Sequence, residues 1–148
     1  MREVKRSALV AQPAARMFAL INDIESYPLF LPWCTSARVQ SQTEQEIIAT
    51  ISVHRGALNA QFTTRNELTA NRHIAMHLVS GPFKTLEGDW TFTALDAPGQ
   101  SGCRVDLLLR FAFANRLSGM IFEPLFEQTA GSLVDAFVAR ARALGTHE

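Results

Sequence analysis

The residues of this 148-residue chain that could do chemistry are few, and the most suggestive are two histidines four positions apart. On a helix, His73 and His77 would share one face and could bind one zinc ion. The apolar residues around them instead alternate with polar ones, which is typical of a β-strand. Four strand residues span about 13 Å at roughly 3.3 Å each, so we expect the two imidazoles to lie too far apart to share a metal.

Motifs for nucleophilic or phosphate chemistry are missing from the sequence. It contains no Gly-x-Ser-x-Gly turn that could expose a catalytic serine. Gly81 and Gly88 flank a lysine, but without the Gly-Lys-Ser/Thr ending of a phosphate-binding loop. Glu123 and Glu127 lie one turn apart near the start of a predicted helix, where the helix dipole favours carboxylates. General acid–base catalysis needs a titratable group within reach of the substrate, so we predict a protein that is not an enzyme.

Charge and cysteine usage narrow the class of protein further. The 14 Lys and Arg residues balance the 14 Asp and Glu residues, so no overall positive field favours DNA as a partner. Cys34 and Cys103 lie far apart with no paired spacing, which predicts reduced thiols rather than a disulfide or zinc site. No metal or obligatory cofactor is predicted.

The lengths of the apolar runs indicate whether the protein spans a membrane, and local basic clusters indicate where it could contact an anionic surface. No run approaches the roughly 20 apolar residues that a membrane span requires. We therefore predict a cytoplasmic protein and leave open a peripheral contact with the inner membrane. Basic residues gather near both ends of the chain and would form a small patch if the ends adjoin: Arg2, Lys5, Arg6, Arg140 and Arg142.

The block from Tyr27 to Cys34 is the most unusual stretch of the chain. It reads Tyr-Pro-Leu-Phe-Leu-Pro-Trp-Cys and contains two prolines four residues apart. Proline fixes φ and removes a backbone donor, so the block is predicted to be a short helix or an ordered loop. Because it is so apolar, it either packs into the core or forms a wall or lid for an oily ligand.

The remaining periodicity predicts the elements that must position this block. Residues 3–11 suit a strand, and Pro13 opens a helix over 14–22. Alternation then predicts strands over 47–53, 58–63, 73–78, 85–92 and 104–113, with turns at 54–56 and 81–82 and a loop at 96–102. Apolar residues at helical spacing predict one long amphipathic helix running from Pro124 to the C-terminus, with 117–122 as a separate turn or kinked lead-in.

This order of elements predicts an α+β fold in which a curved antiparallel sheet of about six strands closes around the last helix. The aromatic residues on the inner face outnumber those that a filled layer needs, which favours an internal cavity. An ordinary aromatic core without a cavity is the alternative.

Several motifs together resemble those of one family. They are Tyr27-Pro28, the segment 30–34, Thr63-Thr64-Arg65, Gly81-Pro82-Phe83, Leu86 with Gly88 and Trp90, and a late strand that carries a cysteine. In order and spacing, residues 6–143 are similar to the coenzyme Q-binding, START-like family, which includes bacterial ribosome-association toxins. The resemblance implies a single START-like domain over residues 1–148 with a helix-grip fold. Pro124 is a departure, because an uninterrupted helix is expected there.

The resemblance also implies a function and a site. Its first implication is non-enzymatic binding of ubiquinone or a similar hydrophobic lipid in an internal cavity, in support of respiratory electron transport. Its alternative implication is a toxin that binds the large ribosomal subunit and blocks subunit joining. The predicted ligand-binding residues are Tyr27, Phe30, Leu31, Trp33, Phe62, Met76, Phe83, Leu86, Trp90, Phe111, Phe113 and Phe126.

Overall fold

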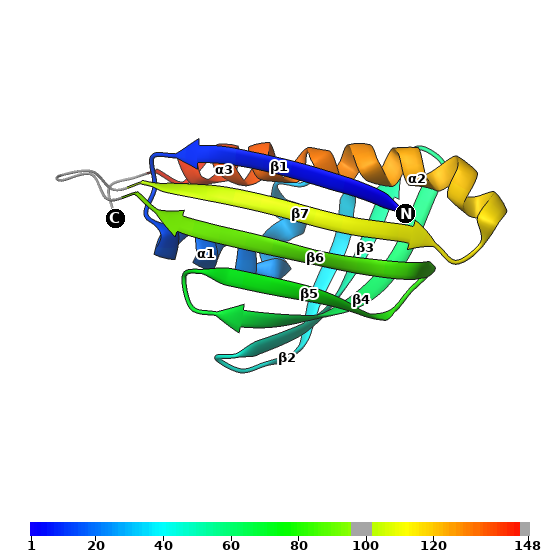
Figure 1. Cartoon of the computed structure of the whole chain (residues 1–148), viewed down its shortest axis with the longest axis horizontal. Helices are drawn as coiled ribbons and strands as arrows, with labels where there is room; N and C mark the ends of the chain where they lie inside the picture. The colour runs from blue at the N-terminus through cyan, green and yellow to red at the C-terminus, as the bar shows by residue number, and fades with distance from the viewer. Residues whose placement is uncertain (96–101, 146–148) are drawn as a thin grey trace.

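A single antiparallel sheet organises the part of the chain that the structure describes, residues 1–95 and 102–145 of a computed structural model (Figure 1). The predicted loop at 96–102 lies outside the described residues except for Gly102. The seven strands found there are β1 (Arg2–Val10), β2 (Cys34–Gln42), β3 (Glu46–Arg55), β4 (Leu58–Thr69), β5 (His73–Ser80), β6 (Phe83–Ala94) and β7 (Cys103–Phe113).

The strand order is β1-β7-β6-β5-β4-β3-β2, so consecutive strands from β2 to β7 form a meander and β1 joins at the far edge. Glycine is needed at two of the turns. Gly56, between β3 and β4, has a φ of 58°, and Gly81, between β5 and β6, has a φ of 147°. A Cβ on Gly81 would lie 2.6 Å from the Cβ of Phe62, so the turn also brings the backbone close to β4.

Strand β2 was not predicted from the sequence. Cys34 and Ala37 are its only buried residues, and their spacing of three does not match the period of two of a strand. Most of its other residues are exposed. It is an edge strand whose pairing with β3 shifts register twice. Short-period alternation is weak in such a strand, because bulges change which face each side chain occupies.

Within residues 1–95 and 102–145, four helical segments accompany the sheet: α1 (Ala14–Asn22), the 3₁₀ helix η1 (Ile24–Leu29), α2 (Arg116–Gly131) and α3 (Leu133–Ala143). Figure 1 shows α2 and α3 end to end along the length of β1 and β7. The predicted helix over 14–22 is confirmed, although Pro13 is its N-cap residue rather than its first helical residue. The first part of the 27–34 block belongs to η1.

The predicted long helix is also present, but its start and its interruption differ from the prediction. It begins at Arg116, because the side chain of Asn115 caps it by accepting from the amide nitrogens of Leu117 and Ser118 at 2.9 and 3.2 Å. Residues 117–122 are therefore the first turns of α2 rather than a separate lead-in. Pro124 lies inside α2 on its exposed side, where solvent can satisfy the carbonyl that loses its partner.

The helix divides at Ser132 instead. The Ser132 hydroxyl donates to the Thr129 carbonyl at 2.7 Å, and the Ser132 amide donates to the same oxygen at 3.2 Å. Such local hydrogen bonds compete with the regular helical ladder. The result is two consecutive helices that keep their apolar sides toward the sheet, with Phe126 in α2 and Phe137 in α3 both buried.

Candidate functional site

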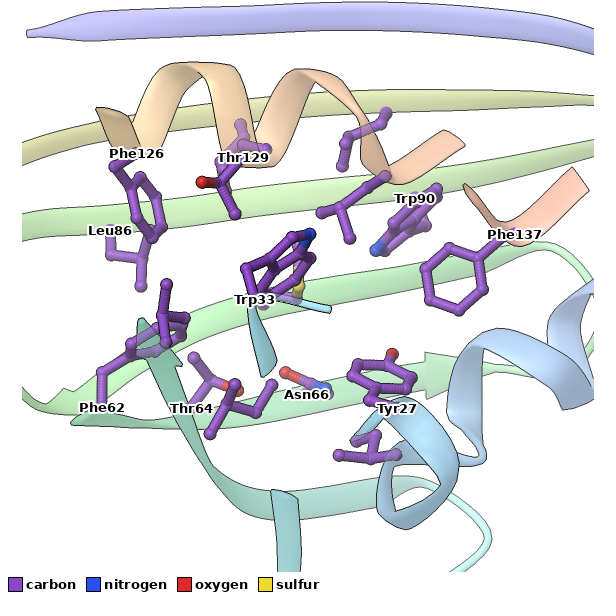
Figure 2. Close-up of a pocket in the computed structure, with 18 residues that line it drawn as sticks. Tyr27, Trp33, Phe62, Thr64, Asn66, Leu86, Trp90, Phe126, Thr129 and Phe137 are labelled. Carbon is purple, nitrogen blue, oxygen red and sulfur yellow. The ribbon is translucent and has the colours of Figure 1, made fainter. Parts of the chain in front are cut away.

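A cavity of about 90 Å³ lies between the inner face of the sheet and the helices η1, α2 and α3 (Figure 2). Its position agrees with the predicted space between sheet and last helix. The lining residues are Ile24, Tyr27, Trp33, Ile51, Val53, Phe62, Thr64, Asn66, Met76, Leu86, Trp90, Leu107, Leu109, Phe126, Thr129, Ala130, Leu133 and Phe137.

One end of the cavity is bordered by aromatic side chains from three different elements. The Phe137 ring of α3 lies edge-on to the rings of Tyr27 and Trp90, with centroid separations of 5.3 and 5.6 Å. The Tyr27 hydroxyl donates to the carbonyl of Ile21, and burial raises the pKa of this phenol. Tyr27 is the one titratable residue among those that line the cavity, and it stays neutral and already hydrogen-bonded.

The cavity also has polar lining residues that the sequence analysis did not identify. Thr64 and Asn66 come from β4, and Thr129 comes from α2 (Figure 2). All three are buried, with exposed fractions of 6, 7 and 2%. The signal was present in the sequence, because the inward alternation of Leu58, Ala60 and Phe62 continues to positions 64 and 66. Because Thr64 and Asn66 are polar, the apolar alternation used to predict the strand ends before them.

Seven of the twelve predicted ligand-binding residues line the cavity: Tyr27, Trp33, Phe62, Met76, Leu86, Trp90 and Phe126. Five do not. Phe83, Phe111 and Phe113 pack with Phe126 in an aromatic cluster, with Phe111 and Phe126 centroids only 4.7 Å apart. These rings interlock with one another, so this end of the core is filled.

The other two residues outside the lining belong to the predicted lid block. Leu31 is completely buried in the core. Phe30 packs edge-on against Phe137 at 5.5 Å and against Tyr27 at 6.2 Å, and the Arg140 guanidinium lies 5.0 Å from its ring centroid. The block is thus divided: Tyr27 and Trp33 face the cavity, Phe30 packs on α3, Leu31 packs in the core, and Leu29 is exposed.

The volume of the cavity limits what it can hold. An apolar cavity of about 150 Å³ is known to accept benzene, and this one measures about 90 Å³. The lining residues Trp33, Ile51, Phe62 and Met76 are partly exposed, so they mark the side on which the cavity approaches the surface. A ring-sized group needs a small displacement of these side chains, and a polyprenyl tail needs a large one.

The two histidines spaced four residues apart lie outside this cavity. His73 and His77 are both on β5, and each contacts its own carboxylate: His73 lies 2.7 Å from Asp89, and His77 lies 2.7 Å from Glu67. The hydrogen bond from His77, together with Arg65, lowers the pKa of Glu67. No group of three or more potential metal ligands occurs among the described residues.

The remaining candidate chemical groups also have structural surroundings. Glu123 and Glu127 both pair with Arg2 of β1, so they join α2 to the edge of the sheet. Both cysteines are buried, and burial raises the pKa of the Cys34 thiol to about 11 and that of Cys103 in the same direction. Neither thiol is therefore activated as a nucleophile.

The curved seven-stranded sheet held against a long C-terminal helix defines a helix-grip, START-like domain. Residues 10–138 match the family described as polyketide cyclase/dehydrase and lipid transport, and the chain belongs to that family. The fold predicted from the sequence is confirmed.

Two named relatives bear on the function. The chain is 42% identical over 142 residues to the ribosome association toxin RatA of Escherichia coli, covering 96% of this chain and 88% of that protein. It is 24% identical to the mitochondrial coenzyme Q-binding protein homolog B of Xenopus laevis, covering 99% of this chain and 61% of that protein. The solved structure of the ZhuI aromatase/cyclase from Streptomyces has a TM-score of 0.83 at 18% identity, covering 98% of each chain, and supports the fold alone.

Proposed function

We propose that this protein associates with the ribosome, binding the large subunit and blocking subunit joining. The observation that carries this proposal is the 42% identity, over nearly the whole chain, with proteins named ribosome association toxin. This function is the alternative that the sequence resemblance implies. It now has more support than ubiquinone binding, because the relative named for coenzyme Q is much more distant.

The edge of the sheet formed by β1 offers a surface for this contact. Strand β1 lies against α2 and α3, but its Arg2 end lies beside α2 and away from α3, which carries Arg140 and Arg142, so the basic residues near the two ends of the chain do not gather into one patch (Figure 1). Arg2 is neutralised by two glutamates, and Arg140 stacks on Phe30. Lys5 and Arg6 remain exposed and form no ion pair among the described residues, so they are suited to contact phosphates.

The test is cosedimentation of the purified protein with ribosomal subunits. We expect the protein to pellet with the large subunit, and we expect Arg6→Glu to weaken this association with a reduced salt dependence. Arg38→Glu is the matched control, because Arg38 is an exposed arginine on β2, the opposite edge of the sheet. No cosedimentation of the unmodified protein would refute the proposal, and equal effects of the two substitutions would refute the assigned surface.

A second candidate function is the non-enzymatic binding of a small apolar molecule, which the mostly apolar lining of the cavity favours. The lining offers no ionisable acid or base apart from a phenol whose pKa is raised, and this supports binding rather than catalysis. A long ubiquinone-like lipid would need the partly exposed side chains on the outer side of the cavity to move, whereas a ring-sized ligand needs much less. Mass spectrometry of organic extracts from the natively purified protein tests this function, and the absence of any apolar compound would count against it.

A further inference from the structure

The side chain of Asn66 is the most unusual polar group in the core. Only 7% of its surface is exposed, and it lines the cavity from strand β4 of the sheet (Figure 2). Its Oδ1 atom has no hydrogen-bond partner among the described residues. A buried amide without a partner is costly, so such a group points to something that binds it.

The surroundings of Asn66 show what kind of group would fit. Across the strands, Asn66 pairs with Ile47 on β3 and Met76 on β5, so its immediate neighbours offer no polar side chain. Thr64, two residues earlier on the same face, adds a hydroxyl that makes no hydrogen bond within the described part of the chain. The facing Thr129 hydroxyl is already used, because it donates to the carbonyl of Leu125 at 2.9 Å.

We infer that Asn66, with Thr64 beside it, binds the hydroxyl group of a compact apolar ligand. A carboxamide offers both an acceptor and donors, and a hydroxyl is the smallest group that can complement both at once. The volume of about 90 Å³ restricts the rest of the ligand to about one ring, bordered by Trp90 and Phe137. The ligand class is therefore a small phenol or alcohol. This inference rests on the second candidate function, the binding of an apolar molecule in the cavity.

The experiment compares phenol with toluene, which are similar in size and differ by a hydroxyl in place of a methyl group. Dissociation constants are measured by calorimetry for the unmodified protein and for Asn66→Leu, a variant of similar volume without the amide. We expect the preference for phenol over toluene to fall about tenfold in Asn66→Leu, because a net hydrogen bond is lost and the ligand hydroxyl is left without a partner. Folding of the variant should be intact, since an unpaired polar group is removed.

The matched control is Asn22→Leu. The Oδ1 atom of Asn22 is also buried without a partner, but Asn22 ends α1 and does not line the cavity. This variant should keep the full preference for phenol. An unchanged preference in Asn66→Leu would overturn the hydroxyl assignment and leave apolar binding intact. A crystal structure grown with phenol that shows only water at Asn66 would also overturn the inference. Failure of both phenol and toluene to bind the unmodified protein would overturn the inference and the second candidate function together. It would leave the proposal of ribosome association unaffected.

Discussion

Filling the cavity by mutation should stabilise this protein, and the size of the gain follows from the cavity volume. Ala130 lies on α2, is 2% exposed and lines the cavity, so Ala130→Leu would extend an isopropyl group into it. Residual cavities cost about 24 cal/mol per Å³. A volume of about 90 Å³ then corresponds to a ceiling of about 2 kcal/mol. We expect a gain of about 1 to 2 kcal/mol, or roughly 3 to 6 °C in Tm.

The assay is urea unfolding together with a thermal melt, and Ala141→Leu is the control. Ala141 is completely buried in α3 but does not line the cavity. Extra methyl groups in a filled core cost about 1 to 3 kcal/mol, so Ala141→Leu should destabilise the protein. If Ala130→Leu destabilises it to the same extent, the core is filled at α2 and the reasoning is refuted.

Three further predictions test the packing, the capping and the buried thiol. Phe126→Ala should cost about 3 to 5 kcal/mol in urea unfolding, because Phe126 joins the aromatic cluster to the cavity wall; a loss below 1 kcal/mol would contradict that packing. Asn115→Ala should cost about 1 kcal/mol by removing the cap of α2, whereas Asn115→Asp should retain it. Burial raises the pKa of Cys34 to about 11, so above pH 9 the unfolded chain loses this proton before the folded one does. The free energy of unfolding should therefore fall between pH 9 and 11, by up to about 2 to 3 kcal/mol more than in Cys34→Ala. If urea unfolding shows the same pH dependence for the unmodified protein and for Cys34→Ala, the raised pKa of Cys34 is refuted.

Sequence periodicity was sufficient to predict most strands of the sheet. Where an inner face is continuously apolar, as from Val105 to Phe113 on β7, alternation of period two identifies both the strand and its buried side. It failed for β2, an exposed edge strand with two register shifts. It also gave no reason to place the helix break at Ser132, because that break depends on local hydrogen bonds to Thr129 rather than on the apolar pattern.

The site was predictable only in part, because a cavity is a property of packing. The inward aromatic residues could be identified from their positions, but the sequence does not show which rings interlock and which leave space. Phe111 and Phe113 pack with Phe83 and Phe126, whereas Trp90 and Phe137 border the cavity. The polar residue Asn66 was missed for a different reason: apolar alternation ends before it, although its position on β4 keeps it on the inner face.

The proposal of ribosome association is tested most directly by a sucrose-gradient profile of ribosomal subunits under conditions that favour joining. With the purified protein added, we predict less joined ribosome, more free subunits, and the protein itself in the fraction of the large subunit. A profile that is unchanged by an excess of the folded protein, with none of it in the large-subunit fraction, would contradict the account.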